Sequence, residues 1–196
     1  MRTILRAIIN TAYRIYYTLV QFMKVEGTEN IPREGPLIIC ANHRSFLDPP
    51  LICITAKRRT YFLAKIELSK NPFFKFLGWI YEVMYVKNDE KDIGAIKGSL
   101  KHLKKGDCVA LFPEGTRNGL EKGQKVRDGA AFFAIRSGAT VIPAGISGKM
   151  RAFSRLKIKY GKPLNYSEYK KAEDEKKALE EVTEDIMKHI LELVED

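Results

Sequence analysis

Cysteine is scarce in this sequence of 196 residues, and it is not arranged for cross-linking. The three cysteines, Cys40, Cys53 and Cys108, lie in apolar segments, and no C-x-x-C pair occurs. The sequence therefore argues against a disulfide framework or a zinc ribbon. We expect all three thiols to be core side chains of a protein that works in a reducing compartment.

Long apolar runs are also missing. The longest segment without a charged side chain spans twelve residues, 137–148, whereas a membrane-spanning helix needs about 20. We therefore expect no transmembrane segment. Arg2, Arg6 and Arg14 interrupt the apolar N-terminus, and no small-residue cleavage site follows it, so a cleavable signal peptide is not expected either.

Acidic residues are rare outside the C-terminal segment. The formal net charge is +10, and residues 166–196 carry −6, which leaves +16 on residues 1–165. A segment with this much positive charge is expected to bind an anionic partner. Three partners have the required charge: nucleic acid, an anionic membrane surface and a phosphorylated substrate. Charge alone does not choose among them.

Residues 1–24 predict an amphipathic helix with a very narrow polar face. Its polar side chains recur every three or four positions, while the remaining surface is Leu, Ile, Phe and Tyr, and no acidic residue precedes Glu26. Such a helix is typical of the membrane interface. The alternative is a helix docked on the core, and the two roles are compatible. The expected polar stripe consists of Arg2, Arg6, Asn10, Arg14, Thr18 and Gln21.

From residue 36 onward, short apolar segments alternate with helical patterns. This alternation predicts one α/β layered domain with a mostly parallel central sheet flanked by helices. A further strand over Leu156–Tyr160 is expected at the sheet edge, and Ser167 is expected to cap a long C-terminal helix. The expected parts are an interface helix at 1–24, a body at 25–165 and a C-terminal helix at 166–196 packed on that body. The other strands are expected at 36–41, 60–64, 82–86, 107–112 and 139–145, with helices near 49–57, 67–79, 91–105 and 127–137.

One histidine stands in a position suited to chemistry. His43 directly follows the first of these strands, and catalytic groups of parallel α/β sheets lie beyond the carboxyl ends of strands. Asp48 follows five residues later and can return against the imidazole, which would leave Nε2 free to accept a proton. No G-x-S-x-G elbow supplies a serine nucleophile, and Cys40 lies inside the apolar strand. The pair therefore suits a substrate's own hydroxyl; the alternative is a buried histidine beside a capping aspartate.

A second group of candidates follows the strand at 107–112. The segment Phe-Pro-Glu-Gly-Thr-Arg at 112–117 forms a tight loop that presents Arg117, a side chain suited to bidentate phosphate binding. Lys65 and Lys87 follow two other strands at the same expected edge. A lone loop arginine is commonly a surface ion pair, but convergence of several strand ends favours an anion site.

Together these segments resemble the glycerolipid acyltransferase family, most closely its bacterial 1-acyl-glycerol-3-phosphate (lysophosphatidate) acyltransferases. Four blocks match in the family's order, and the resemblance covers roughly residues 20–165. The first block is the N-H-x-x-x-x-D signature at 42–48, and the third block, at 112–117, matches without change. The second block spans 78–87, where Lys87 replaces the usual arginine, and the fourth spans 141–145.

The resemblance implies a direct acyl transfer. His43 would be the general base and Asp48 would orient it, while the acceptor's 2-hydroxyl attacks an acyl thioester without an acyl-enzyme intermediate. Lys65 and Arg117 would bind the acceptor's phosphate, with Lys87 as a weaker third cation. The resemblance also assigns Glu114, Gly115 and Thr116 to the shape of that site and Pro143 to the donor side.

The same resemblance implies the partners. The acceptor would be lysophosphatidic acid and the product phosphatidic acid, as in phospholipid biosynthesis. The co-substrate would be an acyl-carrier-protein or acyl-coenzyme A thioester, and no metal or cofactor is implied. Through residues 1–24 the protein would bind anionic lipids at the cytoplasmic face of the cell membrane, as a peripheral or monotopic protein.

One alternative is a related enzyme, and two others belong to different classes of protein. A sister enzyme would acylate glycerol-3-phosphate or another lysolipid, because one fold serves several acceptors. A basic nucleic-acid-binding module is disfavoured, because no helix-turn-helix, RNA-recognition or zinc-finger pattern occurs, and we expect no nucleic-acid partner. A catalytically silent membrane-surface protein would not need the His43–Asp48 pair or the loop at 112–117.

Overall fold

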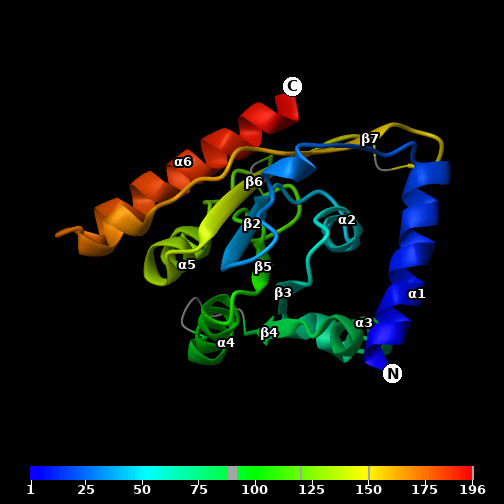
Figure 1. The fold of residues 1–196 in the computed structure, drawn as a ribbon, viewed down its shortest axis with the longest axis horizontal. Helices are drawn as coiled ribbons and strands as arrows, with labels where there is room; N and C mark the ends of the chain where they lie inside the picture. The colour runs from blue at the N-terminus through cyan, green and yellow to red at the C-terminus, as the bar shows by residue number, and fades with distance from the viewer. Residues whose placement is uncertain (88–91, 120, 150, 196) are drawn as a thin grey trace.

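A sheet of seven strands runs through the middle of the molecule, in the order β1-β7-β6-β2-β5-β3-β4 (Figure 1). The structure is a computed structural model that describes residues 1–87, 92–119, 121–149 and 151–195. Every neighbouring pair of strands is parallel except β6 and β7, which confirms the expected mostly parallel sheet. The strands are β1 Lys24–Glu26, β2 Leu37–Ala41, β3 Thr60–Lys65, β4 Met84–Val86, β5 Cys108–Leu111, β6 Thr140–Gly148 and β7 Leu156–Tyr160.

Two details of the sheet differ from expectation. β7 is not the edge strand, because the short strand β1 pairs with it in parallel. β1 has no apolar run for a sequence pattern to detect, since its residues are Lys, Val and Glu. β4 begins later than expected, because Glu82 adopts a left-handed conformation (φ 54°) at the end of the preceding helix.

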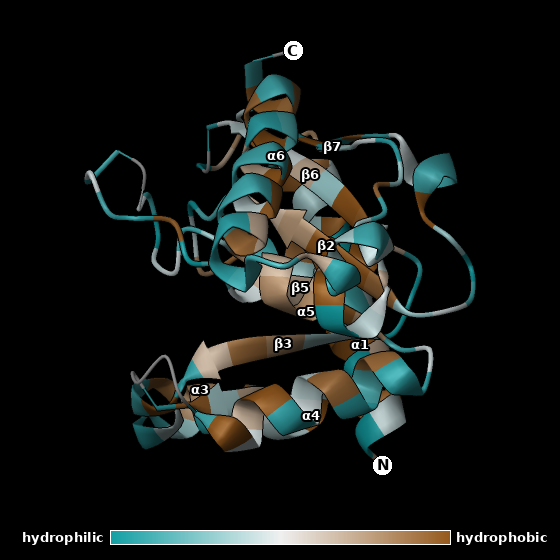
Figure 2. Ribbon diagram, turned by 90° about the vertical axis from the view of Figure 1, so that its left-hand side faces the viewer, coloured by the Kyte–Doolittle hydropathy of each residue, from teal (hydrophilic) through white to brown (hydrophobic). Residues whose placement is uncertain are grey.

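Helices cover both faces of the sheet, and β2 supplies side chains to both. Leu37, Ile39 and Ala41 pack in one core cluster with Tyr17 and with α2. The intervening β2 residues, Ile38 and Cys40, pack in a second cluster with α4, α5 and α6. All five β2 residues are buried, as expected for a central parallel strand. Figure 2 shows largely brown strands between helices that combine brown and teal residues. The helices are α1 Arg2–Ile15, which continues as a π-helical turn over Tyr16–Val20, α2 Asp48–Thr55, α3 Pro72–Tyr81, α4 Ile93–Lys104, α5 Gly129–Ser137 and α6 Glu175–Glu195.

Two helices begin later in the chain than the sequence patterns predict. The helix expected at 67–79 is split into a 3₁₀ turn, Ile66–Lys70, and α3, because the Asn71 side chain caps α3 by accepting from two of its backbone N–H groups. The C-terminal helix does not start at Ser167, which opens another 3₁₀ turn. It starts at Glu175, where the Asp174 carboxylate accepts from the Lys177 N–H at 3.0 Å.

Helix α1 and the π-helical turn after it dock on the body through arginines of the polar stripe and through Tyr13, Tyr16 and Tyr17, which pack in or against the core. The Arg6 guanidinium donates to the Ile80 carbonyl in the last turn of α3, and Arg14 donates to the Ile54 carbonyl in the last turn of α2, both at 2.9 Å. Helix carboxyl ends carry unpaired carbonyls and favour cations, so these arginines are suited to that place. The opposite face of α1 leaves Ile4 66% and Ile8 60% exposed. Among the described residues, no helix has the length and apolarity that a membrane span requires.

Candidate active site

The candidate site lies at the carboxyl edge of the sheet, in the loop between β2 and α2. The His43 Nδ1 lies 2.8 Å from the Asp48 Oδ2. A carboxylate can only accept, so Nδ1 carries the proton of this bond and Nε2 is left as the basic nitrogen. Nε2 has no hydrogen-bond partner among the described residues, and the His43 side chain is 19% exposed. The expected His–Asp pair is thus formed, with its free nitrogen within reach of a substrate.

Asp48 is completely buried, and the loop turns back to satisfy it. Its Oδ2 also accepts from the backbone N–H groups of Arg44 at 2.6 Å and Ser45 at 2.7 Å, while Oδ1 has no partner in the described structure. Asp48 is the first residue of α2, where the helix dipole favours a negative charge. The hydroxyl of Tyr17 donates to the Leu47 carbonyl in the same loop at 2.5 Å. Burial, and then the Asp48 charge, raise the pKa of Tyr17, so this phenol stays neutral.

The Phe-Pro-Glu-Gly-Thr-Arg loop holds the main chain of His43 from the other side. The Glu114 Oε1 accepts from the His43 N–H at 2.9 Å, and Glu114 is only 5% exposed. The Asn118 N–H donates to the His43 carbonyl at 2.6 Å. Gly115 allows this turn, because its φ of 67° is left-handed and a Cβ there would lie 2.5 Å from the Arg127 side chain. Glu114 thus holds the main chain of His43 and Gly115 allows the turn of the loop, while their assignment to the substrate site stays a prediction.

Arg117 lies beside the His43 loop in a stacked arrangement. Its guanidinium carbon is 3.8 Å from the centre of the Phe46 ring, a cation–π contact. Phe46 in turn contacts Phe74 of α3, with ring centres 5.2 Å apart. Arg117 is exposed, and a guanidinium is suited to bidentate phosphate binding.

The two lysine candidates, Lys65 and Lys87, lie at increasing distance from β2 along the carboxyl edge of the sheet. Lys65 ends β3 and is paired with Val86 of β4, and Lys87 follows directly. β3 is two strands from β2 and β4 is three, so at about 4.8 Å per strand these positions lie about 10 and 14 Å across the sheet. Lys87 is exposed, and its backbone N–H donates to the Asp92 carboxylate. Lys65 therefore lies nearer to the His43 loop than Lys87 does, and the role of both lysines stays a prediction.

Two expected site residues lie where their side chains do not reach that edge directly. Pro143 is buried inside β6, and its carbonyl accepts from the Gly161 N–H at 2.8 Å. A backbone N–H at position 143 would point toward β7, on the same side as this carbonyl. The β6–β7 pairing ends at Ala144, so the sheet does not need that N–H and a proline is tolerated there. Thr116 is partly exposed, and its hydroxyl makes only a long contact, 3.4 Å, to the Arg117 carbonyl. Their assignment to the donor side and to the phosphate loop stays a prediction.

Three contributors to the site were missed by the sequence patterns. The Phe112 ring stacks on the His43 ring with centres 4.2 Å apart. The Asn42 side-chain amide makes two hydrogen bonds with the main chain of Ile146, and so joins the end of β2 to β6. Phe46 is the third. Asn42 and Phe112 lie within the two motifs, so their positions signalled importance, but no spacing rule predicts which ring stacks on which.

Comparisons with known proteins identify the family of this chain. A family model described as Acyltransferase matches residues 22–147, which is more than half of the chain. The chain belongs to the Acyltransferase family.

Relatives of this acyltransferase extend the likeness over nearly the whole chain. The 1-acyl-sn-glycerol-3-phosphate acyltransferase of Bacillus subtilis is 26% identical over 189 residues, which is 93% of this chain and 93% of that protein. The enzyme of the same name from Borreliella burgdorferi is 29% identical over 121 residues, 61% of this chain and 48% of that protein. The crystal structure of the 1-acyl-sn-glycerophosphate (LPA) acyltransferase PlsC from Thermotoga maritima superposes with a TM-score of 0.68 and 28% identity, covering 95% of this chain and 80% of that one.

The relatives differ in length from this acyltransferase. The chain spans about half of the Borreliella burgdorferi protein and 58% of the Streptococcus pneumoniae protein of the same name, to which it is 28% identical over 157 residues. The matched family region contains the His43–Asp48 pair, the Arg117 loop and most of β6. It also includes Asn42 and Phe112. The contacts that join the His43 loop to the Arg117 loop and to β6 therefore lie inside the family region.

The thiols of this acyltransferase are predicted to be inert in the folded state. Burial raises the pKa of Cys53 to about 12 and of Cys108 to about 11, and it raises the pKa of Cys40 further still. At pH 8 about one thiol in a thousand or fewer would be a thiolate, the form that reacts. Iodoacetamide labelling followed by mass spectrometry should find all three unmodified in the native protein and alkylated in urea. Rapid native labelling of Cys40 would contradict this and would reopen a covalent role for that residue.

Proposed function

We propose that this protein transfers a fatty acyl group from an acyl thioester to the sn-2 hydroxyl of 1-acyl-glycerol-3-phosphate, giving phosphatidic acid. The observation that carries the proposal is the His43–Asp48 pair at 2.8 Å, with an unpaired Nε2 at the carboxyl edge of the sheet. The names of the relatives suggest the substrate class, because several proteins named 1-acyl-sn-glycerol-3-phosphate acyltransferase match this chain. Membership of the Acyltransferase family supports the reaction type.

The dyad can perform the transfer without an acyl-enzyme. His43 Nε2 accepts the proton of the acceptor hydroxyl as that oxygen attacks the thioester carbonyl. Asp48 holds the other ring nitrogen protonated and stabilises the imidazolium that forms. When the tetrahedral intermediate collapses, the C–S bond breaks and the leaving thiolate takes the proton back from His43. The buried cysteines do not enter this sequence, because their pKa values are far too high for thiolate formation.

The acceptor's phosphate would be held by Arg117, with Lys65 as its partner and Lys87 as a weaker contributor. Phe46 keeps the Arg117 guanidinium beside the His43 loop, so a phosphate bound there would bring the glycerol hydroxyls toward Nε2. The proximity of the two groups matters, because a fixed geometry converts a bimolecular step into an effectively unimolecular one. The donor would be an acyl-carrier-protein or coenzyme A thioester, both anionic, approaching from the Pro143 side.

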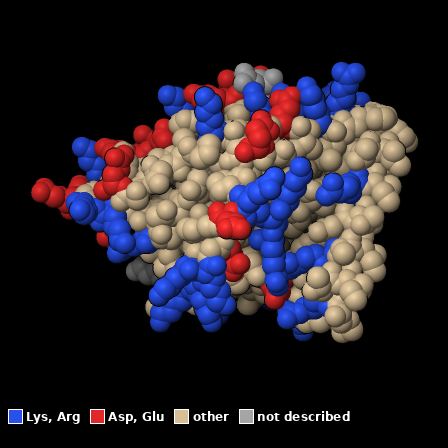
Figure 3. Space-filling view, in the orientation of Figure 1, with Lys and Arg blue, Asp and Glu red and all other residues tan. Residues whose placement is uncertain are grey.

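We further propose that α1 holds the protein on anionic lipids at the cytoplasmic face of the membrane. Its polar stripe is engaged by the body, while Ile4, Ile8, Ile15 and Leu19 are more than half exposed. Figure 3 shows the edge formed by α1 as largely uncharged surface. An exposed apolar face of this kind is suited to the boundary between headgroups and acyl chains.

The dyad predicts a specific loss of activity. His43→Ala should reduce turnover of lysophosphatidate about 10²–10⁴-fold, and Asp48→Asn should lose much of the rate because it no longer fixes the tautomer. A matched control exists in His102, whose Nδ1 lies 2.8 Å from the Asp107 carboxylate, also five residues on. His102→Ala should keep activity, since Asp107 precedes strand β5 at the opposite edge of the sheet. Phosphatidic acid formation by folded protein is the measurement, and a His43→Ala variant with more than half of wild-type turnover would end the dyad mechanism.

The phosphate site predicts a loss that depends on the acceptor. Arg117→Ala should raise KM for lysophosphatidate about 10- to 150-fold, the range expected for hydrogen bonds to charged groups, and Arg117→Lys should restore only part of it. A monoacylglycerol has no phosphate, so its slow acylation should hardly change. Arg136→Ala is the matched control, because Arg136 also lies over a phenylalanine ring, Phe132, but on α5. Equal losses with both acceptors would mean that Arg117 supports the loop and does not bind phosphate.

The exposed face of α1 predicts membrane binding. Ile4→Ser combined with Ile8→Ser should release the protein from phosphatidylglycerol-containing liposomes, because about 25 cal/mol is lost per Å² of apolar surface no longer buried. Point substitutions are preferable to deletion of the helix, since Tyr17 is completely buried in the core. Ile93→Ser combined with Leu191→Ser removes exposed apolar side chains from α4 and α6 and should have no effect. Sedimentation with liposomes is the measurement, and equal binding of the two double variants would refute a role of α1.

A further inference from the structure

We propose that the loop between β6 and β7, of which the structure describes Lys149 and residues 151–155, is a second contact with the anionic bilayer surface and fixes the height of the His43 loop above it. This inference deepens the proposed function and rests on its membrane setting. It concerns an element outside α1 and beyond the family region, which ends at residue 147.

The composition of the loop suits an anionic interface. Lys149, Arg151 and Arg155 are exposed, and the segment has no acidic residue. Between the arginines, Phe153 is 78% exposed. Cations next to an anionic leaflet each add to the attraction, and an aromatic ring adds apolar contact at the headgroup level. A single exposed phenylalanine needs no explanation by itself, but one in a loop that carries three exposed cations and no acidic residue suits an anionic interface.

The loop is built to hold that ring outward. Phe153 has a φ of 58°, which is uncommon for a bulky residue. The Ser154 hydroxyl bonds back to the carbonyls of Lys149 and Arg151, and the Lys149 N–H donates to the Arg155 carbonyl at 3.2 Å. Packing of the ring does not offset the unfavourable backbone conformation, because the ring is in solvent. A conformation maintained without burial indicates a binding role.

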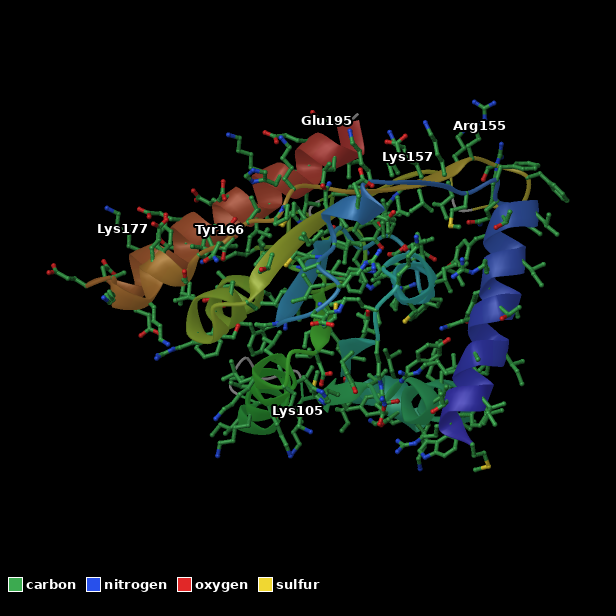
Figure 4. The ribbon with its side chains drawn as sticks, viewed as in Figure 1. Lys105, Arg155, Lys157, Tyr166, Lys177 and Glu195 are labelled. Atoms are coloured by element: carbon green, nitrogen blue, oxygen red, sulfur yellow. The ribbon has the colours of Figure 1, made fainter. Side chains whose placement is uncertain are left out.

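The loop continues the exposed face of α1. The Phe153 N–H donates to the Val20 carbonyl at 2.6 Å, and the Leu156 N–H donates to the Gln21 carbonyl at 3.1 Å. Leu19 and Phe22 beside these contacts are 65% and 54% exposed. Figure 1 shows the gold loop meeting the end of α1, and Figure 4 places Arg155 at that corner, far from Lys105 on the opposite side of the molecule. An acidic carrier protein would also be attracted by the cations, but the shared apolar surface with α1 favours a bilayer.

The base of the loop is bonded to the active-site segment. The Arg44 guanidinium donates to the Gly148 carbonyl at 2.7 Å, and the Arg44 N–H donates to the Asp48 carboxylate. On the other side, Tyr17 next to α1 bonds the Leu47 carbonyl. Both elements that would touch lipid are therefore hydrogen-bonded to the four residues between His43 and Asp48. Contact of both with the bilayer would set where His43 meets an acceptor that resides in the membrane.

The first experiment measures binding without any acyl donor. Full-length protein is titrated with vesicles of equal parts phosphatidylglycerol and phosphatidylcholine, and with vesicles of phosphatidylcholine alone. The loop variant is Lys149→Gln with Arg151→Gln and Arg155→Gln. The matched control is Lys101→Gln with Lys104→Gln and Lys105→Gln on α4, exposed lysines that give the same change in net charge. Thermal unfolding confirms that both are folded.

The expected result is a loss confined to the loop variant and to the anionic vesicles. Three cations near the surface correspond to about a 10- to 100-fold weaker partition, while the α4 variant should stay within about threefold of the parent. Equal losses in both variants would mean a net-charge effect and would overturn the inference. Unchanged vesicle binding with a selective loss of turnover with an acyl-carrier-protein thioester would overturn it too, because the loop would then be a donor dock.

The second experiment asks whether the ring itself enters lipid. Trp79 is the only tryptophan, so Trp79→Phe provides a background in which Phe153→Trp reports alone and Ile93→Trp serves as control. With brominated phosphatidylcholine in the anionic vesicles, fluorescence should be quenched at position 153 and not at 93. Absence of quenching at 153 would overturn the inference. Failure of the proposed function is distinguishable, because it would appear as absent phosphatidic acid formation with quenching intact.

Discussion

A single buried carboxylate organises the active-site region of this acyltransferase. Asp48 has no exposed surface, and a buried charge is costly unless hydrogen bonds replace the water it has lost. Its three donors all come from the residues just before it, the N–H groups of Arg44 and Ser45 and the ring of His43. The loop must therefore fold back on itself at this length, and the alignment of the histidine ring follows from the same requirement. Structure and catalytic geometry share one cause here.

The neighbouring segments hold this loop mainly through its main chain. Glu114 and the backbone of Asn118 bond the N–H and carbonyl of His43, and Asn42 joins the loop's base to β6. Such contacts fix the position of Cα while leaving the imidazole's second nitrogen unoccupied. Phe112 then limits rotation of the ring by stacking on it. A general base needs this combination of a fixed position and an accessible nitrogen.

The sequence was sufficient for the parallel sheet and for the His43–Asp48 pair, because both follow from local rules. Apolar strands alternating with helices fix the layered class, and strand ends fix the edge at which loops gather. Contacts between distant segments were not accessible in this way. The Arg117–Phe46 stack and the Arg44–Gly148 hydrogen bond depend on how loops far apart in the sequence meet. Strand β1 was missed because three residues with two charges carry no apolar pattern.

The net charge of the sequence did not predict which cations are free to bind an anionic partner, and two of the arginines concerned belong to α1. Several of the arginines do not face solvent as free cations: Arg6 and Arg14 bond carbonyls at the ends of α3 and α2, and Arg58 bonds three more carbonyls. Helix α1 is attached through these polar contacts and through the tyrosines that pack on the core, so Ile4 and Ile8 are not needed to dock it and remain more than half exposed. An amphipathic helix held by the core alone would place such isoleucines inward and its arginines in water. The exposed isoleucines are the observation on which the proposed lipid contact of α1 rests, because folding of the chain does not require them there.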